Sequence, residues 1–279
     1  MMDRLKTTGW SVALTAALVL IGQPLAANAK GEPAESVVTL NAMDYSYKGP
    51  DRIKGGVVKV EINNGGKELH HAQLIQLLDG KTFDDFVGLK PALSGPLPRW
   101  AKFVGGPNGA IPGEKATAVM NLEPGNYVVA CLIPDAKGVP HLALGMMKPL
   151  TVTAAETKKA EPKADVTITV ADFRFVPSQP LTAGKHTIKV VNNGTMPHEL
   201  LLVRMAPGKK VADFGAFEAD RSAPPPGKPI GGIVGVQNGM HTYFETDLAP
   251  GNYGLICFFP DEKGEPHFKR GMTLDFTVE

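Results

Sequence analysis

Hydrophobic and polar residues alternate one by one along much of the chain. Val166, Ile168 and Val170 alternate with threonines. Tyr127, Val129 and Cys131 likewise stand at every second position, so they would share one face of a strand. A period of two predicts β-strands that bury one face. The 31 glycines and 24 prolines supply many turns between short strands. The pattern therefore predicts an all-β fold and disfavours a helical bundle.

The second half of the chain repeats the first. Of the 25 positions in 122–146, 14 are identical to the residue 126 positions later. Earlier segments, from Val38 onward, match at an offset of 128. The second half is therefore two residues shorter than the first in the segment that precedes Gly105-Gly106 and its match. A change of length favours a surface loop there. We predict two tandem Greek-key β-sandwich domains, 37–153 and 165–279, with a solvated linker over 154–164.

The first 29 residues have the features of a cleaved signal peptide. Arg4 and Lys6 precede a short apolar run over 10–21, and Ala27-Asn28-Ala29 forms a small-x-small cleavage pattern. An uncleaved N-terminal anchor is the alternative. Cleavage after Ala29 leaves 27 basic and 27 acidic residues, because two bases and one acid are removed. We expect a periplasmic or secreted product with no membrane span in the mature chain, and no nucleic-acid partner, because phosphate contacts need a basic face.

Each half of the chain contains the same set of soft and imidazole donors. A cysteine is followed ten residues later by a histidine and five residues after that by a methionine, and another histidine lies far upstream. A thiolate, two imidazoles and a thioether form the donor set of a type 1 (blue) copper site. We predict two copper sites and electron transfer with redox protein partners. The predicted ligands are His70, Cys131, His141 and Met146 in the first half and His198, Cys257, His267 and Met272 in the second.

These residues resemble those of the cupredoxins, the blue-copper proteins that include plastocyanin and azurin. The segment from Asn192 to His198 is similar to the cupredoxin segment that holds the first histidine, and the later ligands follow in the family's order. In the first half Leu69 replaces the proline. Nine residues separate each cysteine from its histidine, more than in plastocyanin or azurin and closer to the loop in the type 1 domain of copper nitrite reductases. The resemblance implies a histidine–cysteine plane, axial methionines and an electron port at the edges of His141 and His267.

Several alternatives remain open at this point. The two cysteines could form a disulfide, a Cys/His pair could be a protease dyad or a zinc site, and a cupredoxin fold could have lost its copper. Copper delivery or storage would use the same ligands. A two-domain copper oxidase or nitrite reductase would need a second copper centre, whose ligands include a histidine beside the type 1 cysteine. No cysteine here has such a neighbour and no His-x-His pair exists. We therefore expect a carrier and not an enzyme; the oligomeric state stays open.

Two adjacent histidines compete for the first ligand position of the first half. From His70 to Phe86 there are 17 residues, as there are from His198 to Phe214. In this ungapped register His70 matches His198, and His71 matches Glu199. A slip of one residue would turn the side chains of a strand to the opposite face. We therefore predict that His70 is the ligand and that His71 is not.

Overall fold

The computed structural model of this chain describes residues 36–89, 97–156 and 159–279. They belong to one compact unit, Glu35–Glu279. The predicted signal peptide lies outside the described residues. Within the described part, no helix is long and apolar enough to cross a membrane.

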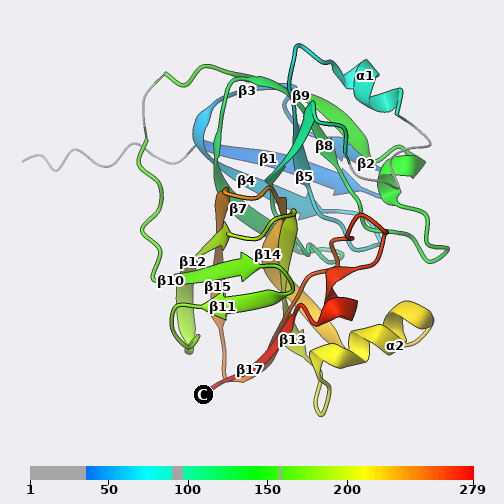
Figure 1. The fold of residues 1–279 in the computed structure, drawn as a ribbon, viewed down its shortest axis with the longest axis vertical. Helices are drawn as coiled ribbons and strands as arrows, with labels where there is room; N and C mark the ends of the chain where they lie inside the picture. Colours follow the sequence, from blue (N-terminus) through cyan, green and yellow to red (C-terminus); the bar gives the residue numbers. More distant parts are fainter. Residues whose placement is uncertain (1–35, 90–96, 157–158) are drawn as a thin grey trace, which may run out of the picture. The chain divides into compact units, whose positions relative to one another are not determined.

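Two sheets contain the strands of the described residues, and both sheets run through the two copies of the repeat (Figure 1). The first sheet has the order β11 (Arg174–Pro177), β10 (Val166–Ala171), β12 (Gly184–Asn192), β15 (His241–Leu248), β7 (Lys115–Leu122), β4 (Gly56–Asn64), β1 (Ser36–Met43), β2 (Ser46–Lys48). The second has the order β17 (Thr273–Val278), β16 (Gly251–Ile256), β13 (His198–Met205), β14 (Gly227–Val236), β6 (Ala101–Gly105), β5 (Gln73–Leu77), β8 (Gly125–Ala130), β9 (Met147–Thr153), β3 (Arg52–Lys54). The prediction of an all-β fold with tandem sandwiches is confirmed.

Helical turns are short and lie in the connections. In the described ranges they are α1 (Phe83–Val87), α2 (Phe214–Ala219) and the 3-10 turns η2 (His141–Leu144), η3 (Val211–Asp213) and η4 (His267–Arg270). The helix α1 begins at a capping box, in which Thr82 and Asp85 satisfy each other's backbone N–H groups. The turns η2 and η4 each contain one predicted histidine ligand.

The alternation of hydrophobic and polar residues in the sequence corresponds to an alternation of buried and partly exposed side chains in the strands. In β10, Val166, Ile168 and Val170 are buried while the intervening residues are partly exposed. The two repeated tyrosines pin the loops before their strands, because Tyr127 donates to the Glu123 carbonyl and Tyr253 to the Ala249 carbonyl, each at 2.7 Å. This arrangement is that of a tyrosine corner.

The two copies meet through repeat-related residues. Asn108 N–H donates to the Gly232 carbonyl at 3.3 Å, and Val234 N–H donates to the Gly106 carbonyl at 3.0 Å. Asn108 and Val234 are repeat mates at the offset of 126, and so are Gly106 and Gly232, so the two hydrogen bonds are equivalent under the repeat. Pro107 pairs with Ile233, its own repeat mate, so this pair lies on a local two-fold axis. The junction thus has the symmetry of an isologous dimer interface.

The repeated Gly-Gly pairs are explained at this junction. Gly106 has φ +141° and Gly232 has φ +127°, a region that favours glycine. A Cβ atom at either position would collide with a backbone carbonyl oxygen, that of Ala72 or that of Leu200. The pairs therefore permit close approach of neighbouring strands, and the ladders shift register next to them.

Part of the predicted linker is held against the second copy. The Glu161 carboxylate lies 2.8 Å from His241 Nε2 and accepts a hydrogen bond from the Tyr243 hydroxyl at 2.8 Å. The linker is therefore less solvated than its composition suggests. The domain boundaries 37–153 and 165–279 stay a prediction; below, these two ranges are called the first and second copy.

Candidate metal centres

The loop after each repeated cysteine is closed by its own polar groups. Cys131 directly follows β8, and the Asp135 carboxylate then accepts the N–H groups of Lys137 and Val139, each at 2.8 Å. An aspartate that accepts from the backbone two residues on forms an Asx turn. Asp261 does the same in the second copy. This turn explains the repeated Pro-Asp segment, which brings the next histidine back towards the cysteine.

Each copy gathers one cysteine and two histidines at a buried point. In each group, the three ligand atoms lie within 4.8 Å of one another. The members are His70, Cys131 and His141 in the first copy and His198, Cys257 and His267 in the second, and all six are fully buried. Each group could hold a metal ion. His71 belongs to neither group.

The distances within the two groups are alike. The Sγ atom of each cysteine lies 3.5 Å from Nδ1 of the histidine in its own loop, His141 or His267. In the first copy the same sulfur lies 3.9 Å from His70 Nδ1. In the second copy His198 Nδ1 lies 3.0 Å from His267 Nδ1. The Nδ1 atoms of all four histidines therefore point towards their centre.

A carboxylate orients the upstream histidine of each centre through Nε2, the ring nitrogen that points away from the centre. Asp44 Oδ1 lies 3.2 Å from His70 Nε2, and Asp172 Oδ1 lies 3.0 Å from His198 Nε2. A partner at the far nitrogen fixes the tautomer of a ligating imidazole, here with the proton on Nε2 and a free Nδ1. The two aspartates are repeat mates.

The predicted axial methionines lie directly beside these groups in the backbone. Met146 N–H donates to the His141 carbonyl at 2.9 Å, and Cys131 N–H donates to the Met146 carbonyl at 3.1 Å. Met272 makes the equivalent bonds with His267 and Cys257. Both methionines are fully buried. The structure therefore holds each thioether residue at the buried end of its own loop.

Burial disfavours the charged forms of both thiols and of His267 before a metal binds. Burial raises the pKa of the Cys131 thiol to about 12 and lifts that of Cys257 well above its usual value. Burial also lowers the pKa of His267 to about 4, with the neighbouring His198 adding to the effect. A metal ion that takes the thiolate must therefore displace a proton. Both cysteines are free, so the disulfide alternative is wrong.

A group of buried polar side chains lies between the two copies, next to residues of both centres, and sequence reasoning missed it. His71 Nε2 accepts the Leu132 N–H at 2.8 Å, and its repeat mate Glu199 accepts the Phe258 N–H at 2.8 Å. Asn108, close to the local two-fold axis, lies beside both side chains, and its own Nδ2 donates to the Ile233 carbonyl at 3.4 Å. Burial lowers the pKa of His71 to about 3 and raises that of Glu199 to about 7. Asn108 therefore lies between two buried polar groups that belong to different copies.

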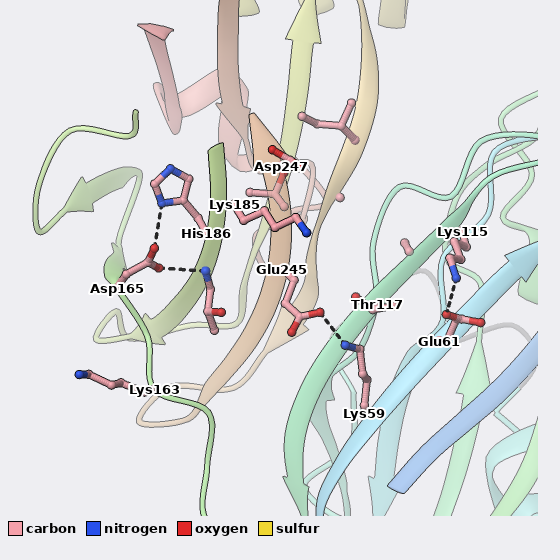
Figure 2. Close-up of a pocket in the computed structure, with 15 residues that line it drawn as sticks. Lys59, Glu61, Lys115, Thr117, Lys163, Asp165, Lys185, His186, Glu245 and Asp247 are labelled. Atoms are coloured by element: carbon pink, nitrogen blue, oxygen red, sulfur yellow. Dashed lines mark hydrogen bonds and ion pairs between the residues drawn. The ribbon is translucent and has the colours of Figure 1, made fainter. Parts of the chain in front are cut away.

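A charged groove lies elsewhere in the molecule and contains none of the predicted ligands. Its volume is about 740 Å³, and both copies contribute to its lining. Figure 2 shows the ion pairs Lys59–Glu245 and Lys115–Glu61 on one side, and His186 bonded to Asp165 on the other. The groove is therefore distinct from the two His/Cys/His centres.

Comparisons with known proteins give structural matches alone. No protein-family model and no curated protein matches the chain. An auracyanin from Roseiflexus castenholzii matches with 19% identity and a TM-score of 0.31, covering 43% of this chain and 99% of that one. A multicopper oxidase matches with 11% identity and a TM-score of 0.26, covering 88% of each chain. The blue copper oxidase of Nitrosomonas europaea matches with 14% identity and a TM-score of 0.25, covering 88% of this chain and 86% of that one.

The prediction that the chain is not an enzyme requires correction. Two of these matches are oxidases, and each covers most of both chains. The prediction rested on the missing histidine beside each cysteine, which is an argument about one kind of second copper centre. The absence of that pattern does not decide whether a chain catalyses a reaction.

Proposed function

We propose that each centre binds one copper ion of type 1 and that the chain transfers single electrons. The proposal is supported by one observation above all: a buried thiol and two imidazole Nδ1 atoms converge in both copies, beside a buried methionine. A soft, mixed N/S donor set of this kind suits copper. Zinc would be an unusual choice beside a thioether.

The chain's own residues supply what a type 1 site needs. The thiolate and the two imidazoles of each copy would hold the ion, together with the thioether of Met146 in the first copy and of Met272 in the second. Bound copper would supply a one-electron couple. The buried surroundings exclude water, and the backbone bonds that tie each loop to its strand hold the donors in place. Donors that are already positioned need little rearrangement when the charge of the centre changes.

The test is metal loading of the full chain. We expect two copper ions per chain and an intense visible absorption after addition of Cu(II), from thiolate-to-copper charge transfer. A matched preparation with both cysteines changed to serine should stay colourless. A colourless wild-type chain after Cu(II) loading would contradict the proposal.

The destination of the electron is a separate question. We propose exported redox proteins as partners, since residues 1–29 have the features of a signal peptide; N-terminal sequencing of the protein recovered from its host tests the cleavage after Ala29. Oxygen consumption by the copper-loaded chain, with a reductant present, measures directly whether dioxygen accepts the electron.

A further inference from the structure

The histidines of the two Cys–His loops have different surroundings at Nε2. His141 Nε2 lies 2.8 Å from the Glu68 carboxylate, which also accepts a hydrogen bond from the Tyr45 hydroxyl at 2.9 Å. Glu68 is therefore held in place by two neighbours. Its side chain is 38% exposed, so the carboxylate also reaches solvent.

The second copy lacks this arrangement. The repeat mates of Glu68 and Tyr45 are Met196 and Phe173, neither of which can accept the imidazole proton. Among the described residues, His267 Nε2 is buried without a hydrogen-bond partner. The Phe173 ring meets the His267 ring edge to face, with centroids 5.3 Å apart.

The second copy has an arginine near its loop histidine, paired with an aspartate. The Arg270 guanidinium lies 4.1 Å from the centre of the Phe173 ring and 3.0 Å from an Asp261 oxygen. Its repeat mate in the first copy is Leu144, which is apolar and exposed. The two centres therefore share their donor atoms and differ in the charge behind the loop histidine.

The different groups around the loop histidine would shift the reduction potential of a bound metal ion. A carboxylate bonded to a ligating imidazole makes that ligand more basic and places negative charge near the metal. Both effects favour the oxidised, more positive ion. In the second copy no carboxylate bonds to the imidazole, and the Arg270 guanidinium is paired with Asp261, so the oxidised ion is favoured less there. We propose that Glu68 makes the first centre the lower-potential one, so that an electron shared by the pair resides on the second centre.

This proposal rests on the proposed function, and its redox balance is simple. One electron leaves the first centre, which is oxidised, and enters the second, which is reduced. The transfer needs no other reactant. Tyr47 is a further difference, since its repeat mate is Phe175, but its hydroxyl donates its single proton to the His71 carbonyl. The same hydroxyl also lies beside the Cys131 sulfur, so Tyr47→Phe is needed to measure its share of the difference.

The experiment measures the reduction potential of each centre by following its visible band. Cys257→Ser leaves the first centre alone, and Cys131→Ser leaves the second. We expect the second centre to hold the electron at least tenfold more strongly, which is about 59 mV for a one-electron couple. Glu68→Gln, which keeps an acceptor without its charge, should raise the potential of the first centre. Met196→Glu should lower that of the second.

Two matched variants and one intact-chain measurement make the result decisive. Glu61→Gln removes a carboxylate that pairs with Lys115 and should leave both potentials unchanged. Tyr47→Phe should move the first centre less than Glu68→Gln does. If a serine variant does not fold, stepwise reduction of the intact protein must still show two steps, which Glu68→Gln brings together.

The outcomes separate this inference from the proposed function. Coloured centres with equal potentials, or an unchanged first centre in Glu68→Gln, would overturn the inference and leave the copper assignment intact. A chain that binds no copper would overturn the proposed function itself. A first centre with the higher potential would show that another group outweighs Glu68 and would also overturn the inference.

Discussion

The two copies keep their donor atoms and change the groups around them. In the first copy the loop histidine is bonded to a carboxylate, and in the second it lies against a phenylalanine ring. The aspartates behind the upstream histidines, by contrast, are the same in both. The comparison teaches that a duplicated site can diverge through residues that do not touch the metal. Each prediction below tests one part of this comparison.

The largest effect should come from removing one thiolate. Cys257→Ser should lower copper binding from two ions to one and remove roughly half of the visible absorption, because each copy supplies all of its own donors. Cys131→Ser is the matched variant and should do the same for the other centre. Metal analysis and the absorption spectrum measure both. Loss of both copper ions from one substitution would mean that the centres are not independent.

The next effect distinguishes two neighbours in the first copy. In a Cys257→Ser background, His70→Ala should abolish the remaining colour, because His70 Nδ1 faces the Cys131 sulfur. His71→Ala should keep the colour but lower the free energy of unfolding by about 1–3 kcal/mol, because it leaves the half-buried Leu132 N–H without its acceptor. Colour retained in His70→Ala and lost in His71→Ala would overturn the assignment.

A smaller effect is expected at the buried polar side chains between the copies. Asn108→Ala should lower the free energy of unfolding by about 1–3 kcal/mol, because the buried amide donates to the Ile233 carbonyl and lies between the buried His71 and Glu199. Denaturant titration at neutral pH measures the change. Asn126→Ala is the control, since Asn126 is exposed and bonds to one carbonyl; it should change stability by less than about 0.5 kcal/mol. Equal effects of the two substitutions would contradict this role of Asn108.

The smallest effect compares the helix starts of the two copies. Hydrogen bonds from the Thr82 backbone and side chain lower the pKa of Asp85 to about 2, below its ordinary 3.8. The ionised carboxylate therefore stabilises the fold above about pH 4, and this contribution is lost as the pH falls towards 2. Asp85→Asn should lower the melting temperature slightly at pH 7 and less at pH 3.

The second copy provides the control for that helix start. Asp213, the repeat mate of Asp85, accepts the Lys210 N–H, but Lys210 has no hydroxyl to donate as Thr82 does. Asp213→Asn should therefore have the smaller effect. A larger effect in the second copy would show that the threonine hydroxyl does not matter.

The sequence was sufficient to predict those parts of the candidate sites whose residues lie close together along the chain. The repeat places a cysteine, a histidine and a methionine at fixed intervals on one loop, so their proximity follows from the local chain. The choice of His70 over His71 followed from strand register, and the structure places His70 with Cys131 while His71 turns to the Leu132 N–H.

Proximity across the fold could not be obtained in the same way. Glu68 precedes His70 by two residues, yet it binds His141. Asn108 lies just after the segment where the repeat offset changes, and its repeat mate is Val234. A signal for Glu68 was available: the residue differs between copies immediately before a shared ligand. No sequence pattern marked Asn108, because its importance comes from its place at the junction.

The local two-fold axis through Pro107 and Ile233 has a consequence for stoichiometry. Two separate, unlike subunits with such self-complementary surfaces would assemble into three species: two like pairs and one mixed pair. A covalent connection raises the effective concentration of one particular neighbour. The residues between the copies therefore do more than tether them. They select the mixed pair, so every molecule carries one centre of each kind in a one-to-one ratio.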